Sequence, residues 1–397
     1  MLSLGSVAQE TDNSMGLWDA VSNGNLMLQL RPRYNYIVED EKPLATNVAT
    51  IRTLLGWRTA PFHDFRLTAQ GIHTDHIGAK RTNDDVDQYF SSPYPLLPDP
   101  PTTDINQLYV DYTGLPATRV RAGRQVIKLD NDRFISDNDF RQIPQVFSGV
   151  TVVNNSLEGT EFYLGHLARI RNFEGEEYPL RMEILHVAYN PVPDHRLGAY
   201  GYFHDQVETG AYTGFENNSN KVIGARADGA FSVSDVAKLL YTAEFAKQKN
   251  YANGDSRINA NYVRLGGGLW WSKFGFRMDY EIKGSNNGAY GFQTPLTDFY
   301  AFNGTALQFT STPVQGLRDV WLTMRGEVAK FGLFTEFHQY RSDNGGFNFG
   351  RELDLSVSYP LLSNLIVKLQ HANYQPGDAI FSDGTVKKYW LAFTYNY

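Results

Sequence analysis

Charged side chains are unevenly distributed along this sequence of 397 residues. The arginines that we expect to line an interior come from the first third of the chain: Arg31, Arg33, Arg52, Arg58, Arg66, Arg119, Arg121 and Arg124. The last third contributes mainly carboxylates: Asp279, Glu281, Glu327, Glu336, Glu352 and Asp354, with Arg277 and Arg325 among them. Guanidinium groups keep their charge and bind carboxylate or phosphate groups through paired hydrogen bonds. Two walls of opposite charge would set a transverse field across a water-filled lumen and filter solutes by size and charge.

A structural role for the same charges is the alternative. Charged side chains on adjacent strands can pair with each other and simply solvate the wall. The first interpretation predicts a mild preference for anionic or polar solutes, and firm cation selectivity would contradict it. Arg124 is a special case, because the alternation of Val120 and Ala122 would point it outward. A β-bulge at Gly123 would turn it back toward the interior.

Motifs for catalysis and cofactor binding are absent from the sequence. It contains no G-x-S-x-G, G-x-x-x-x-G-K or H-E-x-x-H segment, and its 9 histidines are scattered. It has no cysteine, which excludes disulfides and thiolate-bound metals. The carboxylate-rich segment 130–139 offers oxygen ligands for calcium but lacks EF-hand spacing, which favours solvated loop charge. We therefore expect no enzyme activity, no cofactor and no bound metal.

The segments that must position these charges alternate between apolar and polar residues. Leu28 and Leu30, for example, lie on one face, while Arg31 and Arg33 lie on the other. This two-residue period is that of a β-strand with one apolar face. It predicts about 18 strands, with 16 as the alternative, near residues 26–36, 47–58, 62–72, 105–113, 117–126, 145–153, 158–170, 181–190, 195–204, 221–232, 237–249, 260–271, 273–283, 317–328, 330–341, 352–359, 363–373 and 388–397.

Composition restricts the fold class. No segment approaches the roughly 18 to 20 apolar residues that a membrane-spanning helix needs, and the mean hydropathy is −0.39. A barrel strand needs only half of its residues to be apolar, and a sheet in lipid must close on itself to pair its edges. About 18 strands would enclose an interior too wide for side chains to fill. The sequence therefore predicts an all-β, transmembrane antiparallel barrel in the bacterial outer membrane, surrounded by lipid.

Charge and the first residues add two further expectations. The net charge of −7 and the pI near 5.7 argue against nucleic-acid binding. Residues 1–16 are mostly polar and lack a signal-peptide pattern, so we expect the signal peptide of an exported chain to have been removed.

Connections between the expected strands alternate between short and long, which is typical of short periplasmic turns and long extracellular loops. Residues 1–24 would form an N-terminal periplasmic segment and residues 25–397 a single barrel. Loops near 73–104, 127–144 and 284–316 would face or cap the lumen. The third loop would narrow the channel through aromatic residues that could stack on sugar rings: Tyr290, Phe292, Phe299, Tyr300 and Phe302.

Several segments resemble alginate-export-type outer-membrane porins. They are LYVDYTGL at 108–115, VRAGRQ at 120–125, GFQTPL at 291–296, AFNG at 301–304, TPVQGL at 312–317 and GRELDL at 350–355. The resemblance implies a monomeric barrel of 16 to 18 strands that carries solutes across the outer membrane. The terminal Tyr397, with aromatic residues two and four positions before it, also looks like the signal that the barrel-assembly machinery reads.

Three functions remain open from the sequence, and the one we favour least is a structural or enzymatic barrel, which hydrolase activity of the purified protein would reveal. The other two are channels. The first is a porin that lets small polar, anionic solutes diffuse through an Arg-lined constriction. The alternative is a dedicated exporter of an anionic, alginate-like polysaccharide that works with periplasmic partners. Such an exporter would need strongly basic loop segments, whereas acidic residues here slightly outnumber basic ones, 43 to 36.

Overall fold

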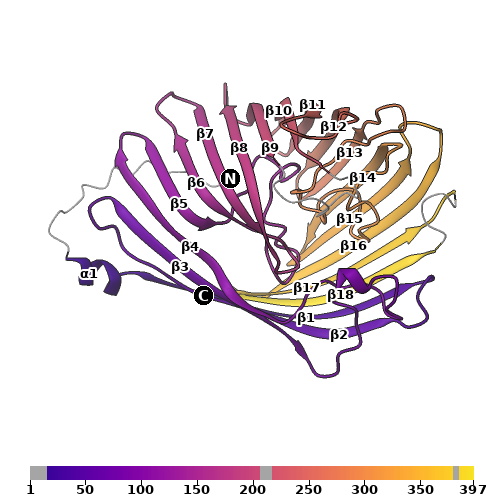
Figure 1. Cartoon of the computed structure of the whole chain (residues 1–397), viewed down its shortest axis with the longest axis horizontal. Coiled ribbons are helices and arrows are strands. Elements are labelled where there is room, and N and C mark those ends of the chain that lie inside the picture. Colours follow the sequence, from indigo (N-terminus) through magenta and orange to yellow (C-terminus); the bar gives the residue numbers. More distant parts are fainter. Residues whose placement is uncertain (1–15, 206–216, 379–383) are drawn as a thin grey trace.

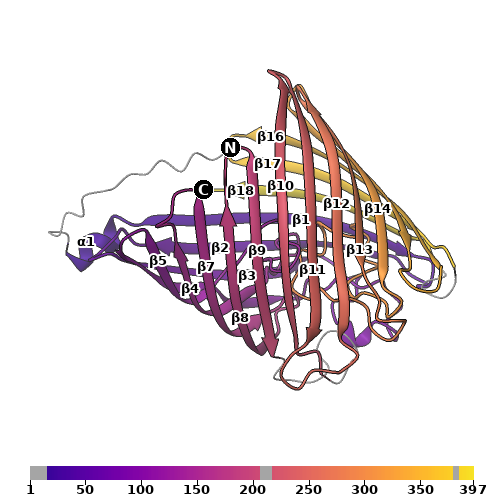
Figure 2. The same cartoon turned by 90° about the horizontal axis from the view of Figure 1, so that it is seen from above.

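The protein is a closed β-barrel in the computed structural model, which describes residues 16–205, 217–378 and 384–397. Its 18 strands form one antiparallel sheet in which each strand pairs with the next along the chain. The first and last strands also pair, with Tyr34 opposite Leu391, and this pairing closes the barrel. Figures 1 and 2 show the barrel from two directions. The prediction of a barrel with 18 strands, not 16, is confirmed.

The strands, in chain order, are β1 (Asn25–Glu39), β2 (Thr46–Arg58), β3 (Phe65–Ile77), β4 (Thr102–Leu115), β5 (Thr118–Gln125), β6 (Val146–Asn154), β7 (Thr160–Arg171), β8 (Glu177–Tyr189), β9 (His195–Asp205), β10 (Asn220–Ser234), β11 (Ala237–Asn250), β12 (Asn259–Trp271), β13 (Phe274–Lys283), β14 (Leu317–Val328), β15 (Phe331–Arg341), β16 (Asn348–Leu362), β17 (Leu365–Gln375) and β18 (Val386–Asn396). Two short helical segments accompany them, α1 (Leu17–Ser22) and a 3-10 turn at Val86–Gln88.

Strand boundaries depart from the expected ones where the strands approach the long loops. β3 was expected to end near residue 72 but runs to Ile77, through the polar residues His73, Thr74 and His76. Hydrogen bonding to β2 continues through this segment, with Thr50 opposite His76. The apolar alternation marks only the part of a strand that faces hydrocarbon, so it ends before the ladder does.

The outer face of the barrel is apolar. On β13, Phe276 and Met278 point outward and are 43% and 54% exposed, whereas the neighbouring Asp279 is buried inside. Large apolar side chains recur on the outer face of other strands, such as Leu265 on β12 and Leu322 on β14. An apolar outer surface of this kind is the surface that a barrel presents to lipid hydrocarbon.

Connections differ between the two ends of the barrel. One end carries tight turns, such as those at 116–117, 235–236 and 329–330, and the other carries loops such as 78–101, 126–145 and 284–316. Helix α1 lies beside the first strands at the end with the tight turns (Figure 2). None of the helices in the described residues is long and apolar enough to cross a membrane. The assignment of residues 1–24 to the periplasm stays a prediction, and residues 1–15 lie outside the described residues.

The packed core lies inside the barrel and is built largely by two loops, residues 126–145 and 284–316, which we call the inner loops. Phe134 of the first and Phe292 of the second pack with Tyr262 of the wall. Between the inner loops and the tight turns lies a cavity of about 1300 Å³, lined on one side by Phe140 and Tyr300. The interior is thus packed on the side of the long loops and hollow on the side of the tight turns.

Candidate functional site

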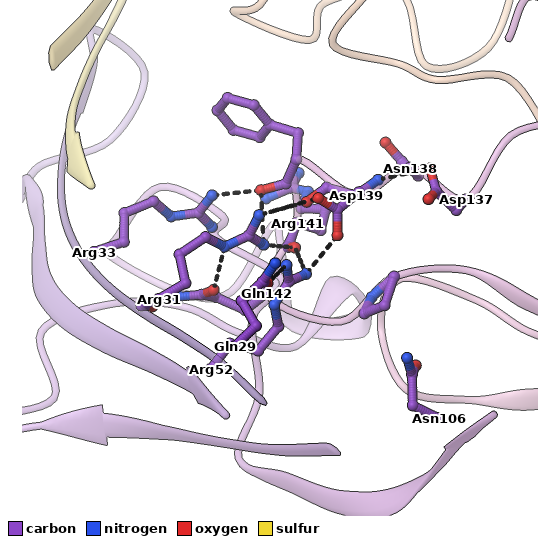
Figure 3. A network of polar contacts seen from close by, with 12 residues as sticks. Gln29, Arg31, Arg33, Arg52, Asn106, Asp137, Asn138, Asp139, Arg141 and Gln142 are labelled. Carbon is purple, nitrogen blue, oxygen red and sulfur yellow. Dashed lines mark hydrogen bonds and ion pairs between the residues drawn. The ribbon is translucent and has the colours of Figure 1, made fainter. Parts of the chain in front are cut away.

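Three arginines from the first two strands bind an inner loop. We call Arg31 and Arg33 of β1 and Arg52 of β2 the arginine wall. Alternation places all three on the inner face, and the register puts Arg31 directly opposite Arg52. Two like charges facing each other across a ladder are unfavourable unless other groups compensate them. The compensation comes from residues 139–142 of the first inner loop, as Figure 3 shows.

Backbone carbonyls and one carboxylate of that loop accept hydrogen bonds from the arginine wall. Arg31 donates to the Asp139 carbonyl at 2.7 Å and to the Arg141 carbonyl. Arg33 donates to the Phe140 carbonyl at 2.5 Å, and Arg52 donates to Oδ1 of Asp139 at 2.7 Å. Because carbonyl groups converge on the guanidinium groups, the loop is bound even where its side chains carry no charge.

A second loop contributes Asp99 to the same network. Its carboxylate lies 2.5 Å from Nη2 of Arg33 and accepts a hydrogen bond from the Gln142 backbone at 3.0 Å. Burial alone would raise the pKa of Asp99, but Arg33 and Arg141 outweigh burial and lower it below its ordinary value. Asp99 therefore stays ionised at neutral pH. The network holds four guanidinium groups against the carboxylates of Asp99 and Asp139, which leaves an excess of positive charge.

The later strands bind the second inner loop through an acidic wall, consisting of Glu281, Asp319, Glu336, Glu352 and Asp354. Loop residues donate to four of these carboxylates. Thr305 donates to Asp354 at 2.6 Å, and the Ala306 backbone donates to Glu352 at 2.6 Å. Asn303 donates to both Glu281 and Asp319. Arg133 of the first inner loop adds a buried ion pair to Glu281 at 2.6 Å.

The two inner loops meet inside the barrel, beside Trp390 of β18. The rings of Phe140 and Tyr300 are stacked with centroids 3.5 Å apart, and the guanidinium of Arg141 lies 5.1 Å from the Tyr300 ring centre. The aromatic residues expected to form a constriction are all buried: Tyr290, Phe292, Phe299, Tyr300 and Phe302. Their rings pack against the barrel wall and the first inner loop, so they stabilise the loop arrangement. Stacking of these rings on sugars stays a prediction.

The cavity below the inner loops is bordered by charged side chains. Asp298 of the second inner loop and Arg325, Glu336 and Lys368 of the wall all line it. Burial raises the pKa of Asp298 to about 6, although the backbone N–H of Tyr300 and the charge of Lys128 act in the opposite direction. A solute in this cavity would therefore contact both signs of charge.

The other arginines expected to line the pore occupy different surroundings. Arg121 forms a two-point ion pair with Asp111 at 2.6 and 2.9 Å, and Arg58 donates to Tyr109. Arg66 is half-buried and Arg119 is exposed. Arg325 is exposed and lines the cavity of about 1300 Å³. Asp279 is held by Arg264 and Arg277.

The bulge expected at Gly123 is not found. Pairing between β4 and β5 continues without interruption from Leu108 opposite Arg124 to Tyr112 opposite Val120. Arg124 therefore keeps the outward register of Ala122, and its guanidinium binds Asp104 at 3.0 Å and also Glu177 near the end of the strand. Asp104 and Glu177 pair with the guanidinium of Arg124, so its charge is compensated without a bulge that would turn the side chain toward the interior.

Sequence reasoning did not identify the loop residues that bind the arginine wall, namely Asp99, Asp139, Phe140, Arg141 and Gln142. Periodicity assigns faces only within strands, and loop residues have no such period. Two signals were nevertheless present: the carboxylate-rich segment 130–139 and the aromatic segment 284–316. Of the carboxylates in the first segment, Asp139 pairs with Arg31 and Arg52.

Comparisons with known proteins agree with this architecture. OccAB2 of Acinetobacter baumannii shares 12% identity over 95% of this chain and 98% of its own, with a TM-score of 0.74. OpdL of Pseudomonas aeruginosa shares 13% identity over 95% of this chain and 99% of its own, with a TM-score of 0.71. OccK7 (OpdD) of Pseudomonas aeruginosa shares 14% identity over 95% and 99%, with a TM-score of 0.70. A comparison with curated proteins found no match.

The closed barrel, its apolar exterior and its polar interior crossed by loops define a transmembrane β-barrel of the outer-membrane type, a fold that the chain shares with the solved structures named above. The comparison with protein families matches residues 25–284, more than half of the chain, to the family described as alginate export. The chain belongs to the alginate export family. The resemblance noted in the sequence is thereby confirmed.

Proposed function

We propose that the chain is a diffusion channel for small polar solutes with a preference for anions, and that the arginine wall and Arg141 line its narrowest part. The observation that carries this proposal is the excess of positive charge where the first inner loop meets β1 and β2. A guanidinium cluster that is only partly neutralised attracts carboxylate and phosphate groups. The carbonyl of Phe140 accepts a hydrogen bond from Arg33 and the same residue lines the cavity, so the cluster adjoins the space that a solute would enter.

The acidic wall supports the same proposal. Neutral donors of the second inner loop, such as Thr305 and the Ala306 backbone, bind its carboxylates and leave them without a paired cation from that loop. Positive charge on one side and negative charge on the other orient a polar solute as it passes. We infer that the pore selects for size and dipole as well as for net charge.

Solute flux into proteoliposomes tests this function. The purified barrel should admit a small carboxylate faster than a neutral sugar of the same size, and a matched amine more slowly. A variant with Arg325→Gln, which changes an exposed cavity residue without altering the loop network, should reduce the preference for the carboxylate and leave the sugar rate unchanged. Equal rates for all three solutes would overturn the proposed preference, and no flux of any solute would overturn the channel itself.

Export of an anionic polysaccharide is the second candidate, and the family description favours it. The stacking of Phe140 on Tyr300 across the interior favours small solutes instead, since a polymer would need the inner loops to separate. Block of the channel current by uronate oligomers at low concentration would support the exporter. Equal effects of uronate oligomers and neutral oligomers of the same length would exclude it.

A further inference from the structure

One histidine of the acidic wall has an unusual environment. His338 on β15 is 2% exposed and is stacked between the rings of Trp321 and Tyr340. Its Nδ1 lies 3.0 and 3.1 Å from the two carboxylate oxygens of Asp319, so Nδ1 carries a proton and donates it. Its Nε2 forms no hydrogen bond with any residue that the structure describes.

Two further carboxylates face this nitrogen. Glu336 lies two residues before His338 on the same face of β15, and Asp354 on β16 is directly opposite Glu336 in the ladder. Oε2 of Glu336 is 3.6 Å and Oδ2 of Asp354 is 4.0 Å from Nε2 of His338. A proton on Nε2 would find no acceptor at hydrogen-bond distance, whereas an unprotonated Nε2 would point its lone pair at two anions.

A bound metal ion accounts for this arrangement. We propose that Glu336, His338 and Asp354 form a binding site for a divalent transition-metal cation of the Zn²⁺ type, with a fourth position open to the cavity. Ligand atoms around such an ion stand about 3 to 4 Å apart, and the three candidate atoms already lie within 4.8 Å of one another. One imidazole among the ligands favours Zn²⁺-like ions over Ca²⁺ and Mg²⁺, which prefer oxygen ligands alone.

Each candidate ligand is oriented by an outer hydrogen bond. Asp319 holds the ring of His338, Thr323 donates to Oε1 of Glu336 at 2.7 Å, and Thr305 donates to Oδ1 of Asp354 at 2.6 Å. A carboxylate that fixes the distal nitrogen of a histidine is the usual support of a metal-binding imidazole. Oε2 of Glu336, the oxygen that faces His338, accepts no hydrogen bond from any residue that the structure describes, so it is available to a metal.

Access to the site is provided by the cavity of about 1300 Å³, because Glu336 and Thr305 both line it. The surrounding charge favours a cation, since Asp319 and Glu352 add two more carboxylates to the acidic wall beside His338. Sequence spacing did not reveal the site, because its ligands come from two strands and pair only through the register of the sheet. Binding of the ion does not depend on the proposed transport function.

Metal binding to the detergent-solubilised full chain tests the inference. After treatment with a chelator, calorimetric titration with Zn²⁺ should give one ion per chain, and Co²⁺ should give a visible d–d absorption band. His338→Gln should weaken Zn²⁺ binding by about 100-fold or more, since one of three ligands is lost. Glu336→Gln, at a less buried position, should weaken it by about 10- to 100-fold and decides the matter if the first variant fails to fold.

His166→Gln is the matched control. His166 also pairs with a carboxylate, Glu183 at 2.7 Å, but both side chains are exposed. The control should bind Zn²⁺ like the wild type, and heat-modifiable electrophoretic mobility should show that all variants are folded barrels. The site is disproved if Zn²⁺ binding survives Glu336→Gln unchanged, if the wild type binds no Zn²⁺, or if equimolar Mg²⁺ displaces it.

Discussion

Asp99 and Arg33 form an ion pair whose side chains are almost completely covered, at 0% and 4% exposure. The pair joins the loop 78–101 to β1 and contacts the first inner loop through Gln142. Removal of one partner of such a pair leaves the other charge buried without compensation, which costs about 3–5 kcal/mol. Charges on this wall therefore stabilise loops as well as setting a field in the lumen.

Asp99→Asn should accordingly lower barrel stability by about 3 kcal/mol and make the channel current noisier, because the loop network loses an anion. Asp87→Asn is the control on the same loop, since Asp87 is exposed and should contribute about 1 kcal/mol or less. Denaturant unfolding in detergent and single-channel recording measure the two effects. Indistinguishable behaviour of the two variants would contradict the role of the Arg33–Asp99 pair.

The same pair predicts how stability depends on pH. The pKa of Asp99 is lowered in the folded barrel, so its contribution is present above the pKa of the unfolded chain. That contribution is lost as the pH falls through the lower, folded-state pKa. The stability difference between the wild type and Asp99→Asn should therefore be constant near neutral pH and shrink in acid.

Asp298 predicts a second pH dependence at the cavity. Because burial raises its pKa to about 6, this carboxylate becomes neutral in mildly acidic solution, while Lys128, Asp132 and Asp137 face it from the first inner loop. The ratio of anion to cation permeability should rise as the pH falls from about 7.5 to about 5. Asp298→Asn should remain near the acidic value at both pH values. A variant that retains the full pH response would refute this role.

At the scale of elements, β5 can lie as close to β4 as it does because residue 123 is a glycine. Its φ of +128° is rarely adopted by residues with a side chain, and a Cβ there would lie 2.2 Å from the Leu108 carbonyl oxygen of β4. Gly123→Ala should therefore lower the yield of folded barrel severely. Gly267→Ala is the control, because its nearest neighbour would be 3.9 Å away. Electrophoresis of unheated samples measures the folded fraction, and equal yields would contradict the argument.

The meeting of the inner loops predicts a change in conductance. Phe140→Ala removes one ring of the stack with Tyr300 and should raise single-channel conductance while leaving the folded fraction unchanged, since Phe140 is only partly buried. Phe90→Ala, at an exposed ring of another loop, should leave the conductance unchanged. If the Phe140 variant conducts like the wild type, the stack does not limit the passage of ions.

The elements differ in how far the sequence determines them. All 18 strands were predictable, because lipid outside and polar groups inside impose a two-residue period on each of them. The inner loops were expected from length and aromatic content, but their binding to two different parts of the wall was not. That pairing depends on contacts between distant residues, such as Arg52 with Asp139 and Asp354 with Thr305, which no local pattern encodes.

At the scale of the whole molecule, the closed barrel provides the frame against which the inner loops pack. The seam between β1 and β18 completes it, and the backbone N–H of Tyr397 donates to the Leu28 carbonyl at 2.9 Å. The terminal residue is thus part of the closure. Recognition of this strand by the assembly machinery and the monomeric state stay predictions, and expression of a chain that lacks Tyr397 would test the first of them.

We propose that the barrel encloses an aqueous path whose fixed charges favour anions. This proposal can be tested by measuring the reversal potential of the wild-type channel in a planar bilayer under a potassium chloride gradient. We expect a stable ionic conductance and a reversal potential whose sign shows that chloride permeates more readily than potassium. Firm cation selectivity, or no conductance from correctly folded barrels, would contradict it.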